Sequence, residues 1–304
     1  MKKSLTISAL VIIAFISFVL PGCIDAGSGT HQGSENYGCI YVIEPAGFEA
    51  VSLFEGQGSL VELYSPTILK NLNIPVETDY SLGYVEISPG NGTPSHYLLG
   101  SGEIIYVISG EGGIKIDGIN HELLTGQAVF IPAGSVQSFS NTGLENLVYL
   151  SSVQPFYKYD IDIQVRGDVS NTTYKSHPEI LISTPEENQQ WNPSSGISIH
   201  AVMNPGMLRL SDNEILPGYS IAVAGFAPGS LIPEHTLMES NELDYILEGE
   251  IEIVSGDNSY TVKKGQAAVI PKGTIREIRN NNDSNAVLLS YVNPYWKEET
   301  SESV

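Results

Sequence analysis

The stretch "SHYLLGSGEIIYVISG" at residues 95–110 decides the fold, because it returns later in the chain as "EHTLMESNELDYILEG" at residues 234–249. A shift of 139 residues, the difference between 235 and 96, superposes two histidines, two glutamates and two closing glycines. The superposed pairs are His96 and His235, Glu103 and Glu242, and Gly110 and Gly249. Self-similarity at one fixed spacing indicates a duplicated structural unit.

The same shift carries the turn residues and the end of the unit. It takes Gly126, Pro132, Gly134 and Asn141 onto Gly265, Pro271, Gly273 and Asn280, and "SSVQPFYK" at 151–158 onto "SYVNPYWK" at 290–297. Each copy has short runs rich in Ile, Val and Tyr between clusters of Gly, Pro, Asn and Asp, which is typical of strands and turns. Only "SPTILKNLNI" at 65–74 suggests a helical turn or two. We therefore predict an all-β fold, as a sandwich, a jelly roll or a closed barrel.

These motifs resemble those of the cupin superfamily. Its first motif contains His-x-His, then Glu and Gly, and its second contains Gly, Pro-x-Gly, His and Asn; the glycine, proline and asparagine positions fit in both copies. The resemblance implies a two-domain protein, a bicupin, with two tandem cupin domains, each a double-stranded β-helix or jelly-roll barrel. We place the N-terminal cupin domain at residues 38–160 and the C-terminal one at 161–304.

The metal-ligand positions implied by this resemblance are only partly filled. Cupins hold a metal inside the barrel with two His, one Glu and a final His, but Leu98 and Leu237 occupy the second His position. His96, Glu103 and Gln137 remain in the first copy. An imidazole, a carboxylate and an amide oxygen can hold a divalent ion. We expect at most one weak site there, for Mn, Fe, Zn or Ni, with a chain that binds no metal as the alternative.

The second copy keeps His235, Glu242 and Arg276 at the corresponding positions. A guanidinium stays protonated and has no lone pair to offer, so Arg276 repels a cation. We expect Arg276 either to pair with Glu242 or to bind an anionic ligand, and we predict these three residues as a ligand-binding set. The alternative is that the polar residues of both copies are inherited and bind nothing.

The N-terminus follows the plan of a secretory signal: "MKKS" is basic, "LTISALVIIAFISFVL" at 5–20 is apolar, and "LPGC" at 20–23 follows. "LPGC" resembles a lipobox, which implies cleavage before Cys23 and lipidation of that cysteine. Ordinary cleavage or a retained membrane-spanning segment is the alternative. We predict a signal peptide at 1–22, a Gly- and Ser-rich tether at 23–37, and an extracytoplasmic protein anchored to the cell membrane. Cys39 would then be a lone thiol without an internal disulfide.

The composition limits the partners. The net charge is −21 at pH 7, with 14 Lys and Arg against 35 Asp and Glu. Phosphate backbones and anionic lipids repel such a surface, so we expect no nucleic-acid binding and membrane contact through the lipid anchor only. Hydrophobic residues make up 41% of the chain, enough to bury two cores. The sequence leaves open whether the chain forms a homo-oligomer.

Three functions fit these features. The first is a lipid-anchored bicupin that binds a small molecule in its barrel. The second is a metal-dependent enzyme, because the plan is similar to bicupins such as ureidoglycine aminohydrolases, oxalate decarboxylases and quercetin dioxygenases. The third is a structural protein of the cell envelope. We favour the first function and assign no catalytic residues, since no G-x-S-x-G motif supports a serine nucleophile.

Overall fold

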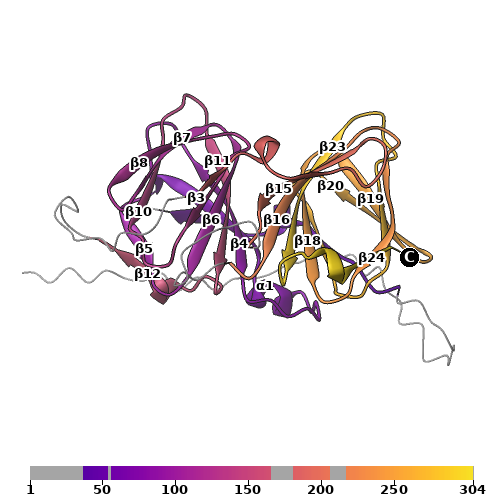
Figure 1. Ribbon diagram of the computed structural model, residues 1–304. Helices are drawn as coiled ribbons and strands as arrows, with labels where there is room; N and C mark the ends of the chain where they lie inside the picture. The colour runs from indigo at the N-terminus through magenta and orange to yellow at the C-terminus, as the bar shows by residue number, and fades with distance from the viewer. Residues whose placement is uncertain (1–36, 54–55, 166–180, 206–216, 304) are drawn as a thin grey trace, which may run out of the picture.

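A computed structural model describes residues 37–53, 56–165, 181–205 and 217–303 of the chain (Figure 1). Two β-barrels lie side by side, and almost every described element is a strand, so the prediction of two tandem jelly-roll barrels is confirmed. Within these ranges no helix is long and apolar enough to cross a bilayer. The predicted signal peptide, Cys23 and nearly all of the tether lie outside the described residues.

In the first barrel a seven-stranded sheet, in the order β13-β9-β6-β11-β4-β3-β2, faces a five-stranded one in the order β12-β5-β10-β7-β8. Its strands are β2 (Val51–Leu53), β3 (Gly58–Tyr64), β4 (Ser81–Ile87), β5 (His96–Leu98), β6 (Gly102–Ser109), β7 (Glu111–Ile116), β8 (Ile119–Leu124), β9 (Ala128–Ile131), β10 (Gln137–Asn141), β11 (Leu147–Gln154), β12 (Asp162–Gln164) and β13 (Ile182–Ser183). One α-helix, α1 (Pro66–Asn71), and the 3-10 helices η1 (Pro45–Gly47) and η3 (Tyr159–Ile161) complete this half.

The second barrel repeats the plan with the orders β1-β21-β18-β23-β16-β15-β14 and β20-β19-β22-β17-β24. Its strands are β1 (Tyr41–Ile43), β14 (Gln190–Trp191), β15 (Ile197–Met203), β16 (Ser220–Phe226), β17 (Leu231–Leu237), β18 (Asn241–Glu248), β19 (Glu250–Ser255), β20 (Asn258–Lys263), β21 (Ala267–Ile270), β22 (Arg276–Arg279), β23 (Ala286–Asn293) and β24 (Ser301–Ser303). Two more 3-10 helices are η5 (Pro185–Glu187) and η6 (Glu298–Thr300).

The border between the domains differs from the predicted one. Strand β12 pairs with β5 of the first barrel, as β24 pairs with β17 of the second. The predicted border between residues 160 and 161 gave β12 to the second domain, and this is wrong. The reason is that the duplicated unit extends past the motifs, so each barrel closes with a strand beyond the "PFYK" or "PYWK" segment.

The two halves exchange short strands. Strand β1 pairs with β21 of the second barrel, and β13 returns to pair with β9 of the first. Each exchanged strand covers a sheet edge that would otherwise present unpaired backbone groups. We therefore expect folding of one half to depend on the chain of the other.

The interface between the barrels is a shared aromatic core. Tyr80 stacks on Tyr219, its counterpart in the repeat, with ring centroids 4.8 Å apart, and Tyr64 and Tyr291 join them. The hydroxyl of Tyr219 donates a hydrogen bond of 2.7 Å to Ser152 across the interface. Helix α1 belongs to the same core and lies between the barrels (Figure 1). This interface fixes the two barrels to each other.

The asparagine and glycine of the repeated motifs have structural roles. The Asn141 amide donates to the carbonyl oxygens of Ile87 and Glu145, both at 2.8 Å, and Asn280 makes the equivalent pair of bonds in the second barrel. Gly110 has φ of +83°, and a Cβ there would lie 2.8 Å from a backbone oxygen. Only glycine fits such a turn without strain. These residues are therefore explained by the scaffold.

Cys39 departs from the prediction. It is disulfide-bonded, so the expectation of a lone thiol is wrong. That expectation followed from removing Cys23 from the pool of thiols by lipidation, since the chain has only two cysteines.

Candidate ligand site

Strand β18 carries two of the polar residues of the second barrel, and both of its faces are buried. Side chains alternate along a strand, so Leu243 and Tyr245 face the core between the barrels, whereas Glu242, Asp244 and Ile246 face the barrel interior. Two carboxyl groups thus stand on one inward face of one strand.

Glu242 is held by Arg276, which lies on β22. The two side chains form a buried ion pair, and Arg276 is only 1% exposed. The Ser290 hydroxyl donates 2.8 Å to the other oxygen of Glu242, and a second guanidinium nitrogen of Arg276 donates to the backbone oxygen of His235. Although burial acts in the other direction, the Arg276 charge lowers the pKa of Glu242. Of the two alternatives for Arg276, the pairing with Glu242 is the one observed.

Asp244 has a different environment. It is 0% exposed, and neither oxygen of its carboxyl group makes a well-formed hydrogen bond among the described residues. The Ser290 hydroxyl is near enough to lower the pKa of Asp244, but it donates its proton to Glu242. Burial, followed by the negative charge of Glu242, raises the pKa of Asp244 well above its usual range, while Arg276 acts in the opposite direction. Asp244 therefore keeps its proton to higher pH than Glu242 does.

His235 completes the set from strand β17. Its Nδ1 lies 2.8 Å from the backbone oxygen of Pro233, which fixes the ring. Burial, with the Arg276 charge second, lowers the pKa of His235 to about 4. The imidazole is therefore uncharged at neutral pH. The structure thus brings together the predicted residues His235, Glu242 and Arg276.

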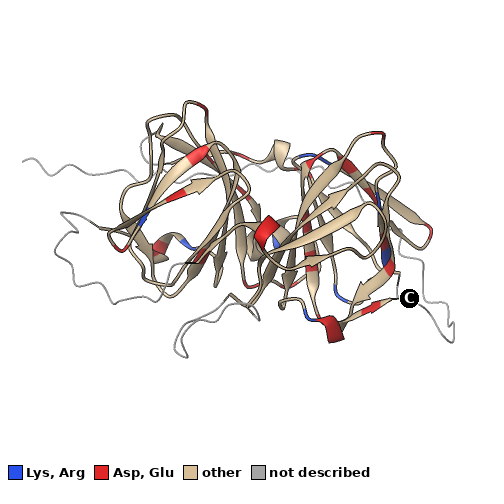
Figure 2. Ribbon diagram, turned by 45° about the horizontal axis from the view of Figure 1, so that its top comes forward, with Lys and Arg blue, Asp and Glu red and all other residues tan. Residues whose placement is uncertain are grey.

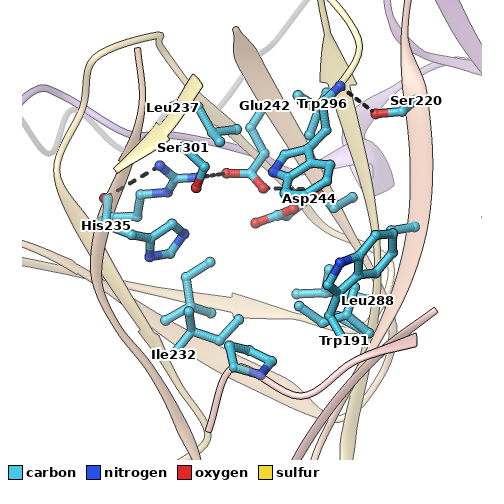
Figure 3. Close-up of a pocket in the computed structure, with 18 of the residues that line it drawn as sticks. Trp191, Ser220, Ile232, His235, Leu237, Glu242, Asp244, Leu288, Trp296 and Ser301 are labelled. Atoms are coloured by element: carbon cyan, nitrogen blue, oxygen red, sulfur yellow. Dashed lines mark hydrogen bonds and ion pairs between the residues drawn. The ribbon is translucent and has the colours of Figure 1, made fainter. Parts of the chain in front are cut away.

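These residues lie at one end of a cavity of about 340 Å³ inside the second barrel (Figure 3). Its walls are mostly apolar and include Phe226, Ile232 and Leu288. Trp191 and Trp296 lie opposite His235 in this view, with ring centroids 5.3 Å apart in an edge-to-face contact. The cavity therefore combines apolar and aromatic walls with a buried, partly charged end.

The first barrel gathers its three predicted residues in the same way. Gln137 is the strand neighbour of His96, and its amide nitrogen donates 2.6 Å to one oxygen of Glu103. The Ser151 hydroxyl donates 2.5 Å to the other oxygen. The His96 ring is fixed on the backbone oxygen of Pro94 at 2.8 Å. The role of His96, Glu103 and Gln137 as metal ligands stays a prediction.

The interior of the first barrel is filled by larger side chains. Phe139 and Tyr149 pack together there with ring centroids 5.1 Å apart, and the 139-residue shift places Ile278 and Leu288 at these positions in the second barrel. Ile105, in the core of the first barrel, corresponds to Asp244. The cavity of the second barrel follows from these smaller residues.

Comparison with known proteins agrees with the two barrels. The family described as "Cupin domain" matches residues 83–153 and again 222–292. The chain has two cupin domains.

Individual relatives cover less of the molecule. The bicupin is 36% identical to "Germin-like protein subfamily 2 member 2" of Arabidopsis thaliana over 112 residues. This match covers 33% of the bicupin and 51% of the relative. It is 32% identical over 81 residues to the "Rhicadhesin receptor" of Pisum sativum, covering 37% of that protein. The bicupin therefore spans about half, or less, of the length of these relatives.

A solved structure shares the whole fold. Oxalate decarboxylase from Bacillus subtilis superposes with a TM-score of 0.68 over 90% of the bicupin and 80% of that chain, at 13% identity. Mn(II) centers are reported in that enzyme. At this identity the likeness shows the fold alone.

The donor set of the bicupin fits a resident metal poorly in both barrels. In the first, both oxygens of Glu103 accept hydrogen bonds and Gln137 presents its N–H group, which has no lone pair. Leu98, 4% exposed, places hydrocarbon at a ligand position. In the second, Arg276 supplies the positive charge. Among the described residues, no three His, Cys, Asp or Glu side chains are grouped to hold an ion.

Restoring the missing histidines is expected to create a metal site. We expect the double variant Leu98→His with Gln137→His to bind roughly one divalent ion per chain, because three imidazoles and Glu103 would then converge. The unchanged bicupin is expected to keep less than about a tenth of an ion per chain. Elemental analysis after purification without chelators measures both. A stoichiometric metal in the unchanged protein would contradict this expectation.

Asp244 is expected to make stability depend on pH. The unfolded chain loses this proton near the ordinary value of 3.8, whereas the folded chain holds it to higher pH. Stability is therefore lost as pH rises through this window. The stability that Asp244→Asn gains over the unchanged bicupin should be larger at pH 7 than at pH 4, by about 1 kcal/mol or more. Urea unfolding at both pH values measures this, with the exposed Asp257→Asn as control; equal differences at both pH values would contradict it.

The sequence reading missed Asp244, Trp191 and Trp296. A signal was present for Asp244, because the shift places this carboxylate opposite Ile105 within an apolar strand. The 139-residue shift places Trp296 at the position of Tyr157, so the difference resembles an ordinary exchange of one aromatic residue for another. Trp191 precedes the aligned region and carried no signal.

Proposed function

We propose that the protein is an exported bicupin that binds a small molecule, and that its ligand site is the interior of the second barrel. The observation that carries this proposal is the cavity of about 340 Å³ with apolar walls and a buried polar end. Small-molecule sites commonly have volumes of about 300–1,000 Å³, apolar linings and a few fixed polar groups. The Arg276–Glu242 pair takes the place of the metal and organises the polar end.

The test compares the protein with a variant whose cavity is filled. Ile278→Phe with Leu288→Tyr introduces the residues that the first barrel has at these positions. Thermal shifts are measured with a panel of sugars, amines, carboxylates and divalent metals. We expect at least one organic compound to stabilise the unchanged protein and to lose its effect in the filled variant. If no organic compound shifts the unchanged protein, or if the shift survives filling, the proposal fails.

We also propose export, with two mutually exclusive roles for Cys23, either as a lipid anchor or as the disulfide partner of Cys39. The basic, apolar and small-residue order of residues 1–23 supports export, and so does the disulfide at Cys39, since such bonds persist in oxidising compartments. A cysteine sulfur that carries a lipid has no valence left for a disulfide. Cys23 therefore serves either as lipid anchor or as the only intrachain partner that Cys39 has.

Intact mass measurement separates these two states. Lipidation predicts a mature chain that begins at Cys23, partitions into detergent and carries the added mass of acyl chains. An intrachain disulfide predicts an unlipidated chain that gains about two mass units on reduction. Full-length chain in the cytoplasmic fraction, with residues 1–22 retained, would contradict export.

A further inference from the structure

The cavity of the second barrel is lined by more carboxyl groups than cationic groups. The lining includes three carboxyl groups, on Glu234, Glu242 and Asp244, and one guanidinium, on Arg276. His235 is neutral at pH 7 because its pKa lies near 4. The charge of Arg276 is already compensated by Glu242 in the ion pair. Asp244 therefore has no cation paired with it that would favour its ionised form, and a bound cation would do so.

Asp244 is the carboxyl group with which a bound cation would pair. In Figure 3 its carboxyl group points toward the middle of the ring of lining side chains, and neither oxygen makes a well-formed hydrogen bond among the described residues. A buried polar group without a partner is costly, so proteins rarely keep one unless a ligand or ion completes it. The first barrel has Ile105 at this position, so the scaffold itself does not need the carboxyl group.

The aromatic walls suit the same kind of ligand. Trp191 and Trp296 line the cavity across from His235, and Figure 3 shows both indoles turned toward the interior. Indole faces attract organic cations, with the largest effect where water is excluded. A net charge of −21 over the whole protein also raises the local concentration of cations.

We propose that the second barrel binds a small organic ammonium ion, with Asp244 as its counter-ion and the indoles of Trp191 and Trp296 beside it. The inference rests on the proposed function of this cavity and names its ligand class. It replaces the expectation of an anionic ligand at Arg276, because an anion would have to displace Glu242 and would meet Asp244.

Isothermal titration calorimetry tests the inference on the full mature chain with three probes. Choline is the cation, 3,3-dimethyl-1-butanol is its uncharged isostere, and acetate is the anion. We expect choline to bind at least about tenfold more tightly than the isostere. Asp244→Asn should weaken choline about 30-fold or more, because it removes the counter-ion from a buried site. Asp257→Asn makes the same substitution in an exposed turn outside the cavity and should change binding less than twofold.

Each other result overturns the inference. Equal affinity for choline and its isostere would show that the site recognises shape and not charge. Tighter binding of acetate than of choline would show that Arg276 is available to anions. Choline binding that survives Asp244→Asn would exclude Asp244 as the counter-ion. If choline fails while other compounds of the thermal-shift panel bind, only the ammonium inference is lost. If nothing organic binds, the proposed function itself is lost. Thermal unfolding of each variant confirms that it is folded.

Discussion

The Glu242→Gln variant is expected to lose about 3–5 kcal/mol of stability. Arg276 is 1% exposed, and its only ion-pair partner among the described residues is Glu242. Removing the carboxylate charge leaves the buried guanidinium without its ion-pair partner. A glutamine fills the same space, so packing changes little and the loss reports the charge.

The repeat supplies a matched control for this result. Glu103→Gln makes the same chemical change at the corresponding place, where the partner is the neutral amide of Gln137. We expect that variant to lose only about 1–2 kcal/mol, the cost of weakened hydrogen bonds. Urea unfolding at pH 7 measures both variants. Equal losses would show that Arg276 does not depend on Glu242.

A double substitution separates the stability lost by leaving one charge unpaired from the net contribution of the ion pair to stability. Glu242→Leu with Arg276→Met replaces both ions by apolar residues of similar size. Buried ion pairs often stabilise little more than such replacements, because desolvation offsets the attraction. We expect the double variant to be more stable than Glu242→Gln. The pair would then be retained for what it does at the cavity, where it holds a fixed charge pattern beside Asp244.

The repeat was readable in the sequence because its turns demand particular residues. Gly110 and Gly249 adopt positive φ, and Asn141 and Asn280 tie the same loops to neighbouring carbonyl groups. Such positions recur at a fixed spacing whatever the strands between them contain. The two barrels and the gathering of His96, Glu103 and Gln137 could therefore be predicted without coordinates.

The exchange of strands between the barrels could not be predicted. Strands β1 and β13 have three and two residues, too few to show an alternating pattern. The cavity was hidden for another reason. It depends on Ile278 and Leu288 being smaller than Phe139 and Tyr149, which matters only once all four are known to face inward.

Separating the two halves is expected to abolish folding of each. Residues 38–165 would keep β1 but lose its partner β21, and residues 181–303 would keep β13 but lose β9. Each half would also expose its share of the core that holds Tyr80, Tyr219 and Tyr291. Large exposed apolar surfaces and unpaired edges lead to aggregation. We expect neither half alone to give a soluble monomer with a cooperative urea transition.

Two controls show whether the lost contacts are the cause. Co-expression of both halves should restore a soluble one-to-one complex, because all the pairing partners are then present. A full-length chain with a protease site inserted between residues 166 and 180 should remain associated after cleavage, since the exchanged strands and the tyrosine core hold the pieces together. A single half that unfolds cooperatively as a soluble monomer would show that the barrels are independent. The cavity of the second barrel could then be studied without the first, and the exchange of β1 and β13 would contribute only to the orientation of the barrels.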